Sequence, residues 1–390
     1  MADRTILIVG AGPVGLTLAW RLVGAGFDVK VFESDEEISD QLRASTFHPP
    51  TLDMFDAVGI TDKLIAAGQI TPTWQIRMHT TGEKAEFDLG VLKDDTKHPY
   101  RLQCRQANLS RALLELLPEG TVQFGAEVTA VDQDASGVSL TANGQAYRGW
   151  ALVGCDGARS LVRKAVGAEF EGTTYPESTI LVTTHFPFED HLEGLSGVNY
   201  IWKPGGTYSL LRLPDLWRIS LHPEPGQDPE EALTDASIRT QTRSVVPEAG
   251  DIDIEEKRIY RVHRRVASTY RKGMLFLCGD AAHLNSPKGG MGLNGGVHDA
   301  FNLAEKLAEV AGGADPARLD AYEAQRRPIA RDDILAQADE NRRRMNTTDE
   351  EERLAHLHRL QSIAADPAKA REFLLRSSMI TGLRRTEELA

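Results

Sequence analysis

The chain has 390 residues, which exceeds the usual size of one domain and predicts two domains that follow each other or interleave. Hydrophobic residues make up 41% of the chain and charged residues 26%, a composition typical of folded globular proteins that excludes disordered and collagen-like classes. Its 57 acidic residues outnumber its 44 basic ones, and the net charge of −13 would repel a phosphate backbone. We therefore expect no nucleic-acid partner and no binding to an anionic membrane surface.

The cysteines and the apolar stretches restrict the class further. Cys104, Cys155 and Cys278 are odd in number and widely separated, which fits neither a disulfide framework nor a zinc site. We expect no bound metal and a reducing, cytoplasmic location. The most apolar stretch, residues 6–20, is interrupted by glycines and is shorter than the roughly 20 residues of a membrane helix, so no membrane span or targeting segment is expected.

The beginning of the chain predicts a strand, a glycine-rich turn, a helix and a second strand. A β-branched run over 5–9 precedes the turn, and apolar residues then recur at helical spacing until Gly24. The turn consists of Gly10, Ala11, Gly12, Pro13, Val14 and Gly15. The second strand, over 28–33, ends at Glu33, about 20 residues beyond the glycines.

This βαβ unit is typical of a dinucleotide-binding site. Gly10 permits the tight turn, Gly12 lets the backbone approach a pyrophosphate, and Gly15 lets the helix and strand pack closely. The N-terminus of the helix faces the phosphates. Glu33 is placed to accept hydrogen bonds from a ribose and would repel a 2′-phosphate, which favours FAD or NAD over NADP as the resident dinucleotide.

Two later segments each deliver an aspartate at the end of an apolar run. The first is the turn at Asp156 in Gly-Cys-Asp-Gly-Ala-Arg-Ser-Leu-Val-Arg, and the second is Asp280 in Leu-Cys-Gly-Asp-Ala-Ala-His. Glycines crowd residues 287–296, before a helix expected from about Val297. So many glycines near the start of a helix suggest that the backbone lies directly against a flat ligand.

Together these three motifs resemble those of the class A FAD-dependent aromatic hydroxylases, the single-component flavoprotein monooxygenases that include para-hydroxybenzoate and phenol hydroxylases. The resemblance covers roughly residues 1–330. It implies an α/β fold: a Rossmann-like FAD-binding domain of the glutathione-reductase-2 type, an inserted antiparallel β-sheet domain for the substrate, and C-terminal helices. The expected FAD-binding domain comprises residues 1–70, 100–170 and 270–330, the substrate domain 71–99 and 171–269, and the helical segment 331–390.

The resemblance also assigns roles to individual residues. Asp280 is similar to the aspartate that binds the ribityl or ribose hydroxyls of FAD, and Asp156 to an aspartate credited with a role towards both FAD and NAD(P)H, with Arg163 helping to hold it. The remaining implied cofactor contacts are Arg43, Gln106, Pro287, Gly292, Leu293 and Asn294, in addition to the turn and Glu33. A helix beginning near Gly292 would direct the positive end of its dipole at the flavin and stabilise its reduced form by about 1 kcal/mol.

The middle of the chain predicts the substrate side of the site. Short alternating runs between 171 and 270, separated by turns, indicate an antiparallel sheet, which a piece near 74–89 is expected to join. A base that takes a proton from a phenol would assist hydroxylation. The candidates on this sheet are Tyr200, Tyr208, His185 and His222, and Pro287 and His283 join them from the flavin loop. A tyrosine or histidine in a strand is, however, more often a packing residue.

By this resemblance the protein is an FAD monooxygenase that uses NAD(P)H and O2 to hydroxylate a small aromatic or heteroaromatic compound through a C4a-hydroperoxyflavin. A related halogenase, an isoprenoid reductase, another natural-product tailoring enzyme and a non-catalytic FAD-binding sensor remain open. The WxWxI motif of halogenases is missing. The helices of 331–390 carry one apolar stripe, which predicts a possible homodimer contact, and the lack of a thioredoxin-like extension indicates a compact member of the family.

Overall fold

The computed structural model describes residues 4–41, 43–224 and 226–389. A six-stranded sheet forms the centre of its first half, with strand order β18-β19-β12-β1-β2-β8. β1 (Ile6–Val9), β2 (Val29–Phe32), β12 (Ala151–Gly154), β19 (Leu275–Leu277) and β8 (Val122–Gln123) are parallel, and only β18 (Arg271–Lys272) runs antiparallel at the edge. The strand β1 is completely apolar and buried because helices or strands cover both faces of the sheet.

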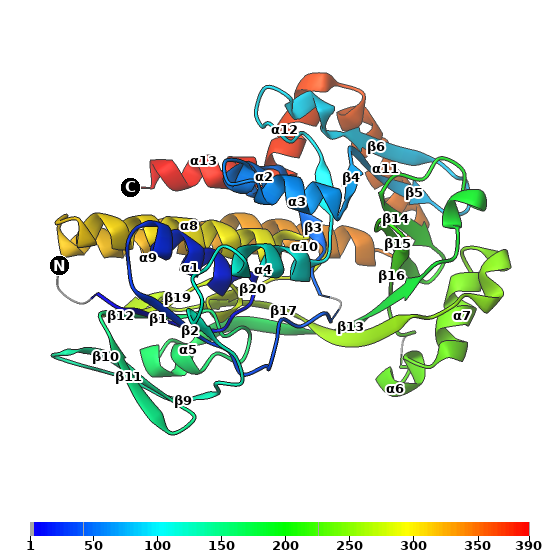
Figure 1. Cartoon of the computed structure of the whole chain (residues 1–390). Helices are drawn as coiled ribbons and strands as arrows, with labels where there is room; N and C mark the ends of the chain where they lie inside the picture. Colours follow the sequence, from blue (N-terminus) through cyan, green and yellow to red (C-terminus); the bar gives the residue numbers. More distant parts are fainter. Residues whose placement is uncertain (1–3, 42, 225, 390) are drawn as a thin grey trace.

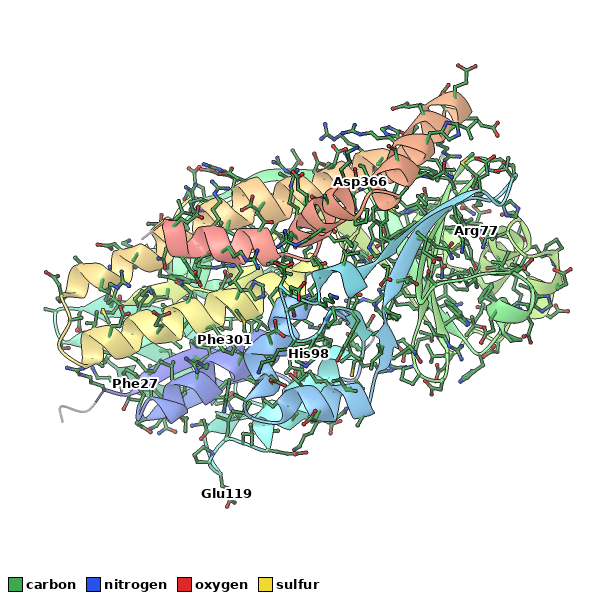
Figure 2. All side chains as sticks on the ribbon, turned by 90° about the horizontal axis from the view of Figure 1, so that it is seen from above. Phe27, Arg77, His98, Glu119, Phe301 and Asp366 are labelled. Atoms are coloured by element: carbon green, nitrogen blue, oxygen red, sulfur yellow. The ribbon has the colours of Figure 1, made fainter. Side chains whose placement is uncertain are left out.

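Three long helices cover one face of this sheet, as Figure 1 shows: α1 (Pro13–Gly24), α4 (Gln106–Leu114) and α8 (Met291–Ala311). The other face carries α5 (Leu161–Val166) and a three-stranded sheet of β9 (Val128–Asp134), β10 (Gly137–Ala142) and β11 (Gln145–Gly149). Helix α1 packs along α8, where Phe301 lies against Trp20 with ring centroids 6.0 Å apart. Figure 2 shows Phe301 and Phe27 in this half and Arg77 at the opposite end of the molecule.

An eight-stranded sheet forms the second half, in the order β20-β17-β13-β16-β15-β14-β5-β6. Its strands are β5 (Thr73–Met78), β6 (Lys84–Asp88), β13 (Phe170–Thr184), β14 (Val198–Lys203), β15 (Gly206–Arg212), β16 (Trp217–Leu221), β17 (Glu256–Ala267) and β20 (His283–Leu284). The long strands β13 and β17 pair along their length; β13 follows α5 and β17 precedes β18, so this pair connects the two halves of the molecule (Figure 1).

The two faces of the eight-stranded sheet differ in character because side chains alternate along each strand. One face, hereafter the outer face, packs Tyr208, Leu210, Trp217 and Ile219 against α6 (Pro229–Ala232), α7 (Asp235–Arg243) and the turns η2 (Phe188–Asp190) and η3 (Pro247–Asp251). The other, hereafter the inner face, carries Tyr200, Ser209 and Ser220 in one register row. Arg218 on this face donates to Ser45, which joins it to the first half of the molecule.

The C-terminal helices lie over the edge between the two halves. They are α9 (Asp320–Pro328), a π-helical stretch (Ile329–Ile334), α10 (Leu335–Asn346), α11 (Glu350–Ala364), α12 (Pro367–Ser377) and α13 (Ile380–Glu388). The remaining elements are β3 (Thr46–Phe47), β4 (Gln69–Thr71), β7 (Arg101–Gln103), α2 (Pro49–Asp56), α3 (Ile60–Ala66), and the turns η1 (Leu89–Leu92), η4 (Gly279–Ala281) and η5 (Pro316–Leu319). Asp95 anchors the last helices, since its carboxylate pairs with Arg371 and Arg384.

The fold class expected from the sequence is confirmed: a Rossmann-type α/β half, a sheet half and C-terminal helices. β5 and β6 join the sheet as expected. One detail of the sheet differs from the expectation, because β5 pairs with β14 in parallel and the sheet is therefore mixed. The division into domains at the expected residues remains a prediction. No helix in the described ranges is long and apolar enough to span a membrane.

Candidate FAD and substrate site

The glycine turn has the geometry that each of its glycines was expected to provide. Gly10 has a φ of +101°, and a Cβ there would lie 2.5 Å from the Cys155 carbonyl oxygen. A Cβ on Gly15 would lie 2.0 Å from the Gly10 carbonyl oxygen, so α1 and β1 could not approach this closely with any other residue. Nothing lies within 4 Å of the same position on Gly12. The open side of the turn is therefore the side on which a pyrophosphate can bind.

Glu33 follows β2 and lies beside this turn. One of its carboxylate oxygens accepts a hydrogen bond from the backbone N–H of Ala11 at 2.7 Å, and the other accepts from Ser34 and Asp35. The carboxylate thus connects the end of β2 to the glycine turn. This position is compatible with the predicted ribose contact, which the remaining lone pairs of the Glu33 carboxylate oxygens would make.

The Asp156 turn is held by a helix cap. Asp156 accepts hydrogen bonds from the Ser160 hydroxyl at 2.5 Å and from the Leu161 N–H at 2.7 Å, which satisfies donors at the start of α5. Arg163 does not hold this carboxylate by an ion pair. Its guanidinium donates instead to the carbonyl oxygens of Ala158 and Ala281 and lies 3.8 Å from the Phe170 ring centroid. Arg163 therefore connects the Asp156 turn with the Asp280 loop.

Asp280 has an exposed side chain, and desolvation by its surroundings nonetheless raises the pKa of its carboxyl. The charges of His283 and Arg43 oppose this shift, which places the expected phosphate-side arginine near Asp280. Gln106 accepts from the backbone N–H of Ala44 at 3.3 Å and joins α4 to the segment that carries Arg43. These three predicted cofactor residues therefore surround one region at the end of the parallel strands.

The loop after Asp280 leads into α8, which begins at Met291, six residues earlier than Val297. Gly292, Gly295 and Gly296 therefore lie inside the helix rather than before it. Close packing explains two of them, since a Cβ on Gly296 would lie 2.5 Å from Val14 and one on Gly295 would lie 2.8 Å from Ile334. The early start directs the first unpaired N–H groups of a 21-residue helix at the loop.

Side-chain hydrogen bonds fix the shape of this flavin loop, residues 285–294. Asn294 is completely buried and donates to the carbonyl oxygens of Thr46 and Gly290 at 2.9 and 2.7 Å. Leu293 is buried beside it, while Pro287 is exposed on the open side of the loop. The backbone from Gly292 to Asn294 is thus held in place from behind, as a surface for a flat ring requires.

His48 supports the flavin loop from behind. It is completely buried, its N–H donates to the Asn294 carboxamide oxygen at 2.9 Å, and its Nε2 lies 2.8 Å from the Gly289 carbonyl oxygen. Burial lowers the pKa of His48 to about 3, so the ring is neutral.

His283 has a supporting position rather than a position in the open site. It is completely buried, and its Nε2 lies 2.8 Å from a carboxylate oxygen of Asp299 on α8. The other oxygen of Asp299 accepts from Arg326 of α9 at 2.7 Å. All three side chains are inaccessible to solvent. The expectation that His283 is a catalytic residue is therefore corrected, because its side chain is inaccessible to solvent and is held by the buried ion pair.

The inner face of the sheet closes over the flavin loop. Arg218 of β16 donates to the Ser45 hydroxyl at 2.7 Å, which joins the sheet to the segment after Arg43. His222 lies close enough to Lys288 of the flavin loop that this charge contributes to lowering the pKa of His222 to about 4, after the larger effect of burial. The Nδ1 of His222 lies 3.0 Å from the Ser178 carbonyl oxygen.

Tyr200 is the tyrosine that lies on this inner face. It pairs with Ser209 across β14 and β15, its ring lies 6.1 Å from that of Trp74, and the charges of Arg101, Arg218 and Arg344 interact with its hydroxyl. Three cations thus approach one phenol.

Tyr208 lies on the opposite face, which corrects the expectation for this residue. It pairs with Ile201 and is completely buried in the apolar cluster under α7, where burial raises the pKa of its phenol strongly. A side chain on the outer face cannot reach a substrate under the inner face. His185 follows the end of β13, is exposed, and pairs with Asp253 at 2.8 Å, so it does not belong to the site either.

Comparison with known proteins identifies this arrangement. The family described as "FAD binding domain" matches residues 3–373. A para-nitrophenol 4-monooxygenase of Pseudomonas sp. strain WBC-3 is 33% identical over 98% of this chain and 97% of its own length. A 6-hydroxy-3-succinoylpyridine 3-monooxygenase of Pseudomonas putida strain S16 is 33% identical over 83% of this chain and 84% of its own.

Solved structures of monooxygenases have the same fold as this chain. The crystal structure of p-nitrophenol 4-monooxygenase from Pseudomonas putida DLL-E4 superposes with a TM-score of 0.90 at 31% identity and covers 97% of this chain and 98% of that one. Aklavinone-11 hydroxylase, solved with FAD and aklavinone, gives a TM-score of 0.78 at 27% identity and covers 89% of this chain and 70% of that one. The glycine turn, Asp280 and the flavin loop fit FAD, which is the cofactor of this family, and the chain belongs to the FAD-dependent aromatic monooxygenases.

Proposed function

We propose that this enzyme hydroxylates a small phenol or hydroxylated heteroaromatic compound with one oxygen atom of O2. The observation that carries the proposal is that Tyr200 and Arg218 lie on the one sheet face that also contacts the segment after Arg43, where Arg218 donates to Ser45. The relatives that match nearly the whole chain or most of it are monooxygenases of a nitrophenol and of a hydroxypyridine. FAD, when bound, supplies the reduction and the oxygen activation.

The residues of the chain would then bind and orient the aromatic ring. A phenol is more reactive towards an electrophilic oxygen once its proton moves to an acceptor. Tyr200 is the inner-face phenol that we propose for this exchange, because its hydroxyl lies near Arg101, Arg218 and Arg344. The uncharged ring of His222 lies at the side of the flavin loop, where it can orient a second polar group of the substrate.

The remaining partners are part of the same proposal. NADH or NADPH reduces the flavin, and it binds without a Rossmann domain of its own, since the chain shows one glycine turn of this type. Asp156 lies at the turn where the resemblance places a contact with both nucleotides. A homodimer and a cytoplasmic location complete the proposal, the latter because Cys104, Cys155 and Cys278 are free thiols.

The test is oxidation of NADH and NADPH by the FAD-loaded enzyme with a panel of phenols, hydroxybenzoates and hydroxypyridines, with mass analysis of products formed under isotopically labelled O2. We expect oxidation that depends on the aromatic compound and one labelled oxygen atom in the product. Substrate reduction without label would identify a reductase instead. FAD binding without stimulated oxidation by any compound would identify a non-catalytic flavin sensor.

A further inference from the structure

A cavity of about 460 Å³ lies among the C-terminal helices. Its wall is formed by α8, the π-helical stretch, α10, α11, α12 and α13. In the part of the chain that the structure describes, none of the predicted cofactor residues and none of the candidate tyrosines and histidines of the sheet belongs to this wall. The cavity has the size of a ligand-binding pocket and is not the site described above.

Helix α8 separates this cavity from the glycine turn. Met291, Gly295 and His298 share one face of α8, since they lie four and then three residues apart. Met291 and His298 line the cavity, and a Cβ on Gly295 would lie 2.8 Å from the π-helical stretch. Gly296 belongs to a different face, where a Cβ would lie 2.5 Å from Val14 of α1. The cavity and the glycine turn therefore lie at different faces of the same helix.

One part of the wall is apolar and mainly aliphatic. Its side chains are those of Ile329, Ile334, Leu360, Ile363, Phe373 and Leu383. Two irregularities of the backbone shape this part. The π-helical stretch interrupts a continuous helical run from Asp320 to Asn346, and Met379, which also lines the cavity, has a left-handed φ of +67° just before α13. Such π-helical turns and strained residues are found frequently at functional sites.

The charged part of the wall contains more arginines than its carboxylates can pair with. The carboxylates already have arginine partners, in the pairs Glu340–Arg343, Asp333–Arg385 and Asp332–Arg331. Three further arginines of the wall, Arg344, Arg359 and Arg376, form no ion pair within the described ranges. An anionic group would therefore find positive charges here that no carboxylate of the chain neutralises.

Arg344 is the most buried of these three arginines and connects the cavity with the flavin loop. Its Nε is buried and has no hydrogen-bond partner among the described residues, which costs free energy until an acceptor binds. Another of its nitrogens donates to the Asn341 carboxamide oxygen at 2.5 Å, and the Asn341 nitrogen lies 3.3 Å from the Lys288 carbonyl oxygen of the flavin loop. A ligand that moves Arg344 would therefore act on that loop.

We infer that this cavity is a second binding site, distinct from the flavin and substrate site, for an amphipathic anion: a medium-length hydrocarbon chain that ends in a carboxylate. The carboxylate pairs with the arginines that have no acidic partner, Arg344 first, and the chain packs against the aliphatic wall at Ile363 and Leu383. Its binding is transmitted to the flavin loop through Asn341. The inference goes beyond the proposed function, and its test needs no turnover.

The experiment separates the contribution of the charge from that of the hydrocarbon chain. Binding of octanoate, octanamide and acetate to the FAD-loaded enzyme is measured by isothermal titration calorimetry. Octanoate should bind at least about tenfold more tightly than octanamide, which lacks the charge, and than acetate, which lacks the chain. Arg344→Gln should reduce the affinity for octanoate to that for octanamide. Arg359→Gln, a change of an exposed side chain that leaves the packing intact, should weaken octanoate a few-fold.

A variant that fills the cavity locates the bound octanoate. Ile363→Trp should weaken octanoate at least about tenfold, with FAD content and Tm measured to confirm the fold. The matched control is His358→Trp on the same helix, because the His358 side chain is 65% exposed and does not line the cavity. This control should bind octanoate as the wild type does.

A second measurement tests the connection to the flavin loop. Octanoate should change the absorption spectrum of the bound FAD, and Asn341→Ala should keep the binding of octanoate but lose this change. The connection is overturned if the spectrum of the wild type stays constant or if the change persists in Asn341→Ala. The second site itself is overturned if octanoate does not bind the wild type, if Arg359→Gln and a folded Ile363→Trp bind it unchanged, or if para-nitrophenol displaces it competitively. All of these results would leave the proposed hydroxylation intact.

Discussion

The two faces of the eight-stranded sheet are built from the same strands but have different roles: one packs against helices, and the other faces the flavin loop. The outer face is sealed by α6 and α7 and consists of apolar and aromatic side chains such as Trp217 and Tyr208. The inner face carries Tyr200 and Arg218 and meets the flavin loop. Tyr208 and Tyr200 belong to adjacent strands, yet one pairs with Ile201 and the other with Ser209. The comparison teaches that the pairing register, and not residue type, decides which tyrosine reaches the site.

The largest expected effect is a loss of stability when the packing of the outer face is disrupted. Trp217 is 2% exposed and packs against Phe188 with ring centroids 6.1 Å apart. Trp217→Ala leaves a cavity and should lower the free energy of unfolding by about 3–5 kcal/mol, measured by urea denaturation. The control Leu116→Ala removes a side chain that is 42% exposed and should change stability by about 0.5 kcal/mol or less. An equally small loss for Trp217→Ala would contradict a packing role for this face.

The next prediction concerns the inner face. Tyr200→Phe removes the hydroxyl that lies among three arginines and should lower the rate of hydroxylation about 100-fold, a usual contribution of a positioned proton acceptor. The bound FAD, measured by absorption, and the Tm should stay close to those of the wild type. A variant with wild-type turnover would remove Tyr200 from the mechanism.

The third prediction concerns how stability and ligand binding depend on pH through Lys288 of the flavin loop. Burial lowers its pKa to about 8 from an ordinary value of 10.5, and Glu177 partly opposes this shift. The folded protein loses this charge as the pH rises through 8, whereas the unfolded chain keeps it to 10.5, so the free energy of unfolding should rise with pH between these values. Binding of an anionic aromatic compound should weaken a few-fold over the same window. Lys288→Met should flatten both curves, and a titration that keeps either slope would contradict the assignment.

The smallest effect is expected for Tyr208→Phe. Its buried hydroxyl has no hydrogen-bond partner among the described residues by geometry, so the loss should alter the free energy of unfolding by about 1 kcal/mol or less and leave turnover unchanged. A marked loss of turnover with retained stability would show that the outer face takes part in the reaction after all.

The glycine turn could be predicted from the sequence because nearby backbone atoms leave no room for a side chain at two of its glycines. Gly10 and Gly15 are required by atoms a few residues away in space, and the βαβ pattern identifies those neighbours. The start of α8 at Met291 agrees with the expectation near Gly292 and not with the one near Val297. Gly295 and Gly296 look like turn residues, but they lie inside the helix, where Ile334 and Val14 leave no room for a Cβ. Local propensity does not reveal such a long-range contact.

The substrate side of the site could not be predicted in the same way. The alternation of apolar and polar residues identifies a strand but does not show which of its faces meets the flavin. Tyr208 and Tyr200 were therefore both candidates. His283 has a conspicuous place in its motif, yet Asp299, sixteen residues later, holds it in a buried ion pair. Arg101 and His48 have no motif at all, since their neighbours come from distant parts of the chain.

The most direct test of the whole account is product analysis under labelled O2 for the wild type, Tyr200→Phe and Tyr208→Phe, each loaded with FAD and supplied with the same phenol and NADH or NADPH. The account predicts one labelled oxygen atom per product molecule for the wild type and Tyr208→Phe, at equal rates, and a rate lower by about 100-fold for Tyr200→Phe. Equal rates for all three, or loss of labelled product in Tyr208→Phe alone, would contradict the claim that the reaction takes place under the inner face of the sheet.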